Sequence, residues 1–203
     1  MASGQQHRRF FYIQGKERLS LNRKMERDKA FRAISEYYNE TDLDTELRKG
    51  SVLKETSKGL FVPTNMRLAY EFFNRIRLEE YSRFIDLGSG DGRIVLIASL
   101  FTQAEGIEYD DGLYQCAQEN KKKLGFNAEF SKGDMLEHDI SGYDSVFMYP
   151  DKEISPQLNE KLKRELKGDL FVFTSTFLPE GLETEEVNVD FMKFCICRNT
   201  KNI

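Results

Sequence analysis

The residues best suited to chemistry lie in one short stretch. Asp86 stands two positions before the first of three alternating glycines, which are Gly88, Gly90 and Gly92. Glycine allows a backbone φ above zero and lets a ligand approach the chain closely. The dinucleotide-binding pattern spaces its glycines differently, and an acid at position 86 disfavours a pyrophosphate. We therefore expect the turn to bind a ligand through an amino group or another cationic part.

Apolar residues on both sides predict the elements that position this turn. Phe84, Ile85 and Leu87 form a short run that is typical of a strand buried on both faces. Residues 94–100 are apolar almost all round, which is typical of a helix packed under a sheet. The stretch thus predicts a strand, a glycine turn and a helix, whose first N–H groups face the ligand over the turn.

Two further acids stand at the ends of the next two predicted strands. Glu108 ends the strand expected over 104–108, and Asp134 follows the strand expected over 126–130. The separation of Glu108 from Gly90 is close to the roughly 20 residues found in nucleotide sites. Three acids at three consecutive strand ends indicate one binding site rather than an incidental turn.

The segment 86–93 resembles motif I of the class I S-adenosylmethionine-dependent methyltransferases. The resemblance implies S-adenosyl-L-methionine as cofactor. It implies that Asp86 holds the methionine amino end, that Glu108 binds the ribose, and that Asp134 contacts the adenine edge. The expected cofactor-binding residues are Pro63, Thr64, Asp86, Gly88, Ser89, Gly90, Gly92, Glu108, Tyr109, Asp134 and Met135.

Val62-Pro63-Thr64 narrows this resemblance to a subgroup. Followed by a helix that leads into the glycine turn, it resembles the small protein-lysine methyltransferases of archaea and mitochondria, relatives of the ATP synthase c-subunit lysine methyltransferase. The similarity spans residues 60–178. In that subgroup the segment closes over the cofactor near the reacting methyl. We also expect Thr64 to cap the helix predicted over 65–78.

The end of the fourth strand, predicted over 143–149, bears on the substrate. Enzymes that methylate exocyclic nitrogens of bases carry Asn- or Asp-Pro-Pro-Tyr/Phe there. Met148-Tyr149-Pro150-Asp151 lacks the leading amide or acid and the second proline, which counts against a base methyltransferase. The resemblance gives candidate catalytic roles to Tyr149 and Thr64. An aromatic channel near a positive sulfonium would lower the pKa of a lysine, which is about 10.4 in solution.

Strands and helices alternate after residue 80, and two alternating strands follow over 186–190 and 191–197. This order predicts an α/β, Rossmann-like fold with a mostly parallel seven-stranded sheet, helices on both faces and a C-terminal antiparallel hairpin. We expect the methyltransferase domain at 61–203. Residues 1–60 are predicted to be a helical extension, with helices over 17–39 and from Thr41 or Asp42 to Gly50.

The charge is unevenly distributed. Residues 1–32 hold nine Lys or Arg against three Asp or Glu, a net charge of +6, so the remaining residues carry −10. An acidic body suits a basic protein substrate better than a phosphate backbone. The basic arm is either a solvated helix face or a contact for nucleic acid or another acidic surface.

Other sequence features bear on compartment and partners. No apolar run approaches the roughly 20 residues of a membrane span, and the N-terminus lacks a secretory pattern. Cys116, Cys195 and Cys197 are expected to be reduced thiols, because no metal-type spacing accompanies them. We expect a cytoplasmic protein-lysine methyltransferase. A nucleic-acid or small-molecule methyltransferase, and a cofactor-binding module without turnover, stay open as alternatives.

Overall fold

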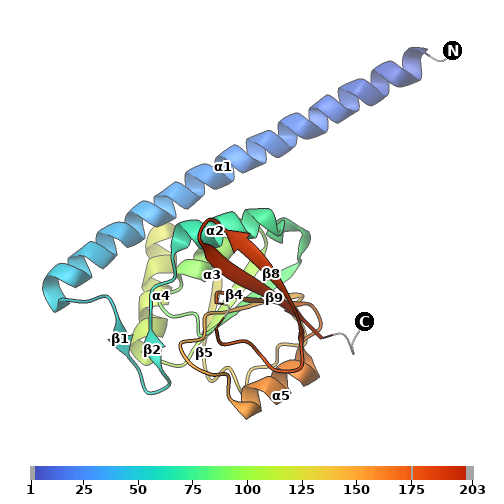
Figure 1. Ribbon diagram of the computed structural model, residues 1–203. Helices are drawn as coiled ribbons and strands as arrows, with labels where there is room; N and C mark the ends of the chain where they lie inside the picture. Colours follow the sequence, from blue (N-terminus) through green and yellow to red (C-terminus); the bar gives the residue numbers. More distant parts are fainter. Residues whose placement is uncertain (1–2, 175, 200–203) are drawn as a thin grey trace.

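A computed structural model describes residues 3–174 and 176–199, with side chains from residue 21 onward (Figure 1). Its main sheet has seven strands in the order β5-β4-β3-β6-β7-β9-β8. Neighbouring strands from β5 to β7 are parallel, and β9 is antiparallel to both β7 and β8. The strands are β3 (Arg83–Leu87), β4 (Gln103–Glu108), β5 (Glu129–Lys132), β6 (Ser145–Met148), β7 (Asp169–Val172), β8 (Glu183–Val189) and β9 (Met192–Arg198). The predicted mostly parallel sheet with a C-terminal hairpin is confirmed.

A small two-stranded antiparallel hairpin, β1 (Lys54–Glu55) and β2 (Leu60–Phe61), precedes this sheet. The helices are α1 (Ser3–Lys49), α2 (Met66–Arg75), α3 (Arg93–Ala98), α4 (Asp111–Leu124), α5 (Pro156–Glu165) and the short 3₁₀ helix Leu78–Glu80. From β3 the chain adds β4 and β5 on one side, and it then crosses back to add β6 and β7 on the other side. The order of strands therefore changes direction next to β3, which lies between β4 and β6. In open α/β sheets this is where ligands bind.

Each face of the sheet has its own hydrophobic core. Side chains alternate between faces along a strand, so Phe147 packs toward α1–α4 while Val146 packs toward α5. In the first core the Phe72 ring of α2 stacks on the Phe194 ring of β9, with centroids 4.2 Å apart. Cys195 and Cys197 of β9 are free thiols buried in the second core, as predicted. Helices therefore cover both faces, which confirms the expected layering.

The N-terminal region is one helix, and the prediction of two helices separated near residue 40 is wrong. The Thr41 hydroxyl donates to the Tyr37 carbonyl at 2.8 Å, the i−4 contact of a hydroxyl within a helix. Asp42 accepts hydrogen bonds from Arg93 rather than capping a helix start. Ile34 and Tyr38 have no exposed surface, so this part of α1 packs on the body, while its N-terminal part extends away from it (Figure 1).

Two local predictions about element ends are also corrected. Asn65, and not Thr64, caps α2, because the Asn65 side chain accepts from the Leu68 N–H at 3.1 Å. The third strand starts at Glu129 rather than 126, since its pairing with β4 begins there, opposite Glu105. Asp110 is the N-cap residue of α4 and Gly125 its C-cap residue.

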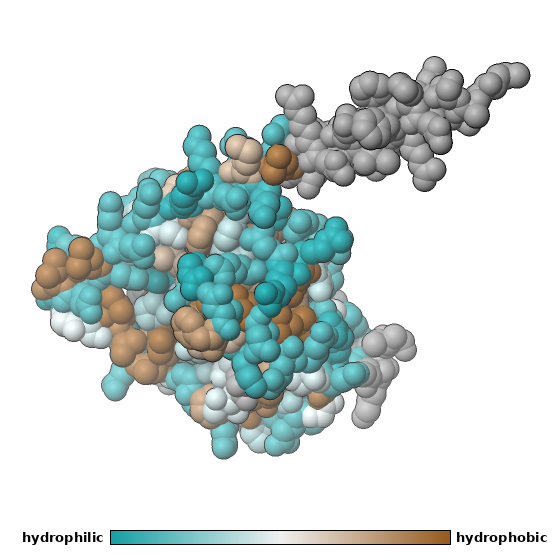
Figure 2. Space-filling model, turned by 45° about the horizontal axis from the view of Figure 1, so that its top comes forward, coloured by the Kyte–Doolittle hydropathy of each residue, from teal (hydrophilic) through white to brown (hydrophobic). Residues whose placement is uncertain are grey.

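The surface is mostly hydrophilic, with apolar patches at the end of α1 and around the β1–β2 hairpin (brown at the left of Figure 2). The exposed apolar side chains of these elements include Leu43, Leu47, Leu53 and Leu60. Within the described residues, no helix combines the length and the apolar character that a membrane crossing requires.

Candidate active site

Two adjoining cavities open at the carboxyl edge of the parallel strands. The first, of about 320 Å³, is lined by Glu108, Tyr109, Asp134 and Met135 among others. The second, of about 330 Å³, is lined by Thr64, Asp86, Ser89, Gly90 and Phe177 among others. Six residues line both cavities: Leu60, Phe61, Gly88, Tyr149, Pro150 and Asp151. These six residues mark where the cavities meet.

The glycine turn folds tightly against the end of β4. Gly88 N–H and Ser89 N–H both donate to the Ile107 carbonyl, at 2.9 and 3.0 Å. Gly90 has φ +56°, and a Cβ at that position would lie 2.5 Å from the Phe61 ring. Glycine is therefore required at position 90 both for the backbone conformation and for the approach of Phe61.

Asp86 is a buried acid that lines the second cavity. Only 4% of its surface is exposed. Burial, together with the carboxylates of Glu108 and Asp91, raises the pKa of Asp86 well above its usual value. A cationic group entering the cavity would favour the charged carboxylate, so the position suits the amino end of a ligand.

Glu108, the last residue of β4, is hydrogen-bonded to the glycine turn. Its Oε2 accepts from the Gly90 N–H at 2.8 Å, and its Oε1 accepts from the Asp110 N–H at 2.7 Å. Each carboxylate oxygen can accept a second hydrogen bond. The side chain is thus held in one orientation at the first cavity, with accepting capacity left for ribose hydroxyls.

Asp134 faces the same cavity but already has a protein partner. Lys58 Nζ, from the loop between β1 and β2, donates to its Oδ2 at 2.8 Å. This contact and the Leu136 N–H lower the pKa of Asp134. The ammonium of Lys58 also lies 4.5 Å from the centre of the Tyr109 ring. Lys58 therefore covers Asp134, the residue expected at the adenine edge, and Tyr109, another of the expected cofactor-binding residues.

The β1–β2 hairpin reaches three strand ends, which no pattern in the sequence indicated. Besides the contact of Lys58 at the end of β5, Lys54 Nζ donates to Asp110 Oδ1 at 2.5 Å, after β4. The Leu60 N–H donates to Asp151 Oδ2 at 2.7 Å, after β6. Lys54 lowers the pKa of Asp110. The hairpin thus covers the first cavity by contacts to the ends of β4, β5 and β6.

Some residues expected at the cofactor lie elsewhere. Gly92 lines neither cavity, and a Cβ there would come within 2.6 Å of the Phe130 ring and 2.9 Å of the Ala117 Cβ. We therefore assign Gly92 to packing of the turn on α4 and β5 rather than to cofactor contact. Pro63 also lines neither cavity, whereas its neighbour Thr64 lines the second.

Tyr149 stands at the junction of the cavities. Its ring packs edge to face on Phe173, with centroids 4.8 Å apart, and 38% of the residue is exposed. Phe61 lies over the glycine turn at the same junction. The junction is therefore walled by aromatic rings on two sides.

The residues present fit a bound S-adenosylmethionine. Ser89 lines the second cavity, and its buried hydroxyl, which has no hydrogen-bond partner among the described residues, packs on Gly106 of β4. The turn admits a ligand closely at Gly88, where the nearest atom to an added Cβ is the Met135 Cε at 3.4 Å. Glu108 and Asp134 in the first cavity and Asp86 in the second supply carboxylate oxygens that can accept hydrogen bonds from amino and hydroxyl groups of a ligand.

Comparison with known proteins agrees with this geometry. Residues 86–186 match the family described as the ANTKMT methyltransferase domain. A protein-lysine N-methyltransferase of Saccharolobus islandicus (strain REY15A) is 30% identical over 132 residues, covering 63% of this chain and 82% of the archaeal protein. The ATP synthase c-subunit lysine N-methyltransferase of Homo sapiens is 31% identical over 121 residues, covering 58% of this chain and 51% of the human protein. The match thus spans about half of the human protein.

A solved structure extends the comparison to the fold. The RNA methyltransferase of Salinibacter ruber, in complex with S-adenosyl-L-homocysteine, superposes with a TM-score of 0.56 at 28% identity. The superposition covers 68% of this chain and 92% of that chain. The similarity extends over most of the described α/β body.

Proposed function

Because the chain belongs to the ANTKMT methyltransferase domain family, we propose that it methylates a lysine side-chain nitrogen of a protein substrate. The enzyme is an S-adenosylmethionine-dependent methyltransferase. When bound, this cofactor supplies a methyl group on a positively charged sulfonium. The observation that carries the lysine assignment is the aromatic junction, where Tyr149 and Phe61 wall the point at which the two cavities meet.

The two cavities divide the cofactor between them in this proposal. The first cavity takes the adenosine part, with Glu108 accepting from the ribose hydroxyls and Asp134 from the adenine edge. Met135 lies against the adenine face. In the second cavity, Asp86 holds the amino end, directly or through water, and Ser89 lines the wall beside the same part of the ligand. The support for this division is the lining of each cavity.

A lysine nucleophile has to lose a proton before it can accept a methyl group. The ammonium form prevails in water, where the pKa is about 10.4. Apolar rings such as Phe61 and Phe177 at the second cavity would disfavour the charged form and lower that pKa. The rings also exclude water and align the amine, which is the main contribution that a protein makes to a transfer of this kind. Tyr149 and Thr64 are the residues we propose to orient it.

The charge of the body supports a basic protein as substrate. Residues 33–203 carry a net charge of −10, and an acidic surface attracts a lysine-rich segment while it repels a phosphate backbone. The segment Met148-Tyr149-Pro150-Asp151 also lacks the Asn- or Asp-Pro-Pro pattern of enzymes that methylate bases.

A nucleic-acid methyltransferase is the second candidate. The observation that favours it is the similarity to the Salinibacter RNA methyltransferase, together with the net charge of +6 in residues 1–32. Side chains of residues 1–20 lie outside the described part of the chain. The charge of this arm is therefore known from the sequence, and the surface that it forms is not described.

The cytoplasm is the compartment we propose, supported by the free thiols of Cys116, Cys195 and Cys197.

The test is transfer of a labelled methyl group from S-adenosylmethionine to a total lysate, analysed after nuclease and after protease treatment. The proposal predicts label that protease removes and nuclease leaves, on a discrete protein band. Label that nuclease removes would support the second candidate. Tight binding of S-adenosylhomocysteine with no label in any fraction would indicate a binding module without turnover.

A further inference from the structure

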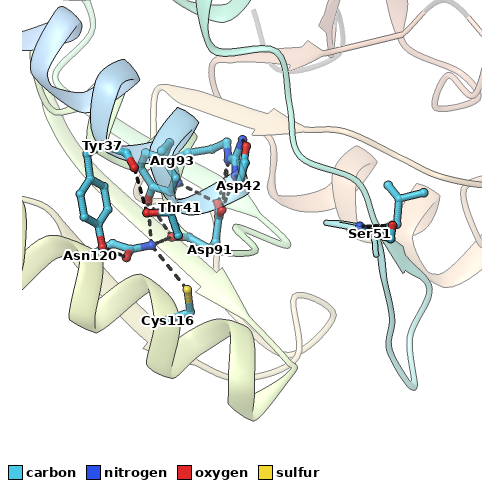
Figure 3. Close-up of polar contacts among 10 residues, drawn as sticks. Tyr37, Thr41, Asp42, Ser51, Asp91, Arg93, Cys116 and Asn120 are labelled. Carbon is cyan, nitrogen blue, oxygen red and sulfur yellow. Dashed lines mark hydrogen bonds and ion pairs between the residues drawn. The ribbon is translucent and has the colours of Figure 1, made fainter. Parts of the chain in front are cut away.

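The glycine turn is held from behind by helix α1. The carbonyl of Asp91, between the second and third glycines, accepts a hydrogen bond from the Tyr38 hydroxyl at 2.8 Å. It also accepts from Asn120 Nδ2 of α4 at 3.1 Å. Two elements distant in sequence thus fix one backbone carbonyl of the turn. Figure 3 shows Asp91 between α1 and α4, with Asn120 directed toward it.

The Asp91 side chain is held from the same side. Its carboxylate pairs with Arg93, the closest atoms being Oδ2 and Nη2 at 2.6 Å. The same guanidinium pairs with both carboxylate oxygens of Asp42 on α1, at 2.8 and 3.0 Å. This two-pronged contact fixes the guanidinium plane, which a single ion pair would not do. The guanidinium also lies 4.7 Å from the centre of the Tyr38 ring.

The contacts among Tyr38, Arg93 and Asp91 are buried, whereas the Asp42 side chain that pairs with Arg93 is 31% exposed. Tyr38 has no exposed surface, Arg93 is 4% exposed and Asp91 is 7% exposed, so water does not compete for the partners. Burial and the Asp91 carboxylate raise the pKa of Tyr38 well above its usual value, so its hydroxyl stays protonated and can donate. Removal of either carboxylate would leave the buried charge of Arg93 only partly compensated, which destabilises this arrangement.

The same residues border the cofactor cavity on their other side. Asp91 and Arg93 line the second cavity together with Asp86 and Gly90. Glu108, which lines the first cavity, accepts a hydrogen bond from the Gly90 N–H. The turn is therefore fixed on one side by the strand end that meets the ligand and on the other by α1.

We propose that Tyr38 and Asp42 are positioning residues for cofactor binding, because they hold Asp91 and Arg93 and thereby the shape of the glycine turn. The inference rests on the proposed role of that turn as the cofactor site. It makes α1 part of the binding unit, so that the functional domain includes residues 31–42 and does not begin at residue 61. Neither Tyr38 nor Asp42 lines either of the two cavities described above, and both act through the turn.

The test is calorimetric binding of S-adenosylhomocysteine to Tyr38→Phe and Asp42→Asn in the full chain. Tyr38→Phe keeps the ring and removes two hydrogen bonds, the one donated to the Asp91 carbonyl and the one accepted from Asn120 Nδ2 at 3.2 Å. A net contribution of about 0.5–1.5 kcal/mol from one such bond corresponds to a Kd raised about twofold to tenfold. We expect the Kd to rise at least about twofold in each variant, and to return toward the wild-type Kd in Asp42→Glu. The matched control is Asp44→Asn, which breaks an exposed pair with Arg48 on the same helix and should leave the Kd unchanged.

A second readout separates positioning from general stability. Since coupling between binding and the α1 contact is reciprocal, S-adenosylhomocysteine should slow amide hydrogen exchange in residues 34–42 of the wild type. That slowing should be reduced in Tyr38→Phe at a temperature where the variant is fully folded. If Tyr38→Phe does not fold, Asp42→Asn carries the test, because Asp42 is partly exposed.

The outcomes distinguish this inference from the proposed site. Folded variants of Tyr38 and Asp42 that bind with the wild-type Kd would overturn the positioning role while leaving the site intact. If Asp86→Asn also binds with the wild-type Kd, the assignment of the glycine turn as the cofactor site fails, and this inference fails with it.

Discussion

Replacing Asp86 by Asn should weaken cofactor binding and stabilise the unliganded protein. The substitution keeps the size of the side chain and removes its charge. Two unit charges about 5 Å apart attract by about 3 kcal/mol at an effective dielectric constant of about 20. Loss of that attraction to a cationic amino group corresponds to a Kd raised by about two orders of magnitude. Isothermal titration with S-adenosylhomocysteine measures it directly.

The effect on stability follows from the raised pKa of Asp86. An acid whose pKa is higher in the folded state than in the unfolded state binds its proton more tightly when folded. Its ionisation therefore costs folding free energy, and this cost grows as the pH rises from the ordinary aspartate value through the raised value. At pH 8 the unliganded Asp86→Asn variant should unfold at a higher urea concentration than the wild type. Near pH 4 the difference should disappear.

Cofactor binding should have the matching pH dependence. A cationic ligand favours the ionised carboxylate, so the wild-type Kd should fall as the pH rises through the raised pKa, with release of a proton on binding. Titration in two buffers of different ionisation enthalpy detects that proton. Binding by Asp86→Asn within threefold of the wild type, or a variant less stable than the wild type at pH 8, would refute the electrostatic role of Asp86.

Three further substitutions test other residues of the site and the core. Gly90→Ala places a Cβ 2.5 Å from the Phe61 ring at a φ of +56°, so it should abolish S-adenosylhomocysteine binding in calorimetry. The control is Gly50→Ala, where an added Cβ has no atom within 4 Å; this variant should bind normally. Tyr149→Ala should lower kcat about tenfold or more through lost alignment of the nucleophile, with the cofactor Kd unchanged; equal losses in both would place Tyr149 at the cofactor instead. Phe72→Ala removes a fully buried ring and should lower the free energy of unfolding by about 3–5 kcal/mol; a urea titration showing a loss under about 1 kcal/mol would contradict the packing.

Local signals account for what could be predicted from the sequence. The strand–glycine–helix stretch needs only neighbouring residues, and its turn forms as expected. The cap at Asp110, whose side chain accepts from the Leu113 N–H at 2.9 Å, and the left-handed Gly125 that ends α4 are equally local. The C-terminal hairpin was predicted from two successive alternating runs, whereas the order of strands across the sheet is not a local property.

Competition between local signals explains the errors. Thr64 and Asn65 are both good capping residues, and the sequence alone does not show which one the extended Pro63 segment brings to the helix start. Thr41 and Asp42 carry the composition of a helix cap, but Asp42 pairs with Arg93 across the fold. In the continuous helix α1, Asp42 makes this tertiary contact instead of capping a helix start.

Contacts between distant segments could not be predicted from one sequence. Lys58 lies 76 positions before Asp134, its partner, and nothing in its neighbourhood distinguishes it from an exposed loop lysine. Tyr38 lies 53 positions before Asp91, in a region that was predicted to be outside the domain. The acids were identified because each stands at the end of its own strand or just after it, whereas Lys58 and Tyr38 come from a distant part of the chain.

Identification of the methylated amino acid tests the proposed lysine methylation most directly. The labelled protein band from the lysate reaction would be hydrolysed completely and its radioactive amino acids separated beside methylated standards. We predict that the label elutes with N-methylated lysine and is absent when Asp86→Asn replaces the wild type. Label on another amino acid, on nucleotides, or undiminished with Asp86→Asn would contradict the proposal.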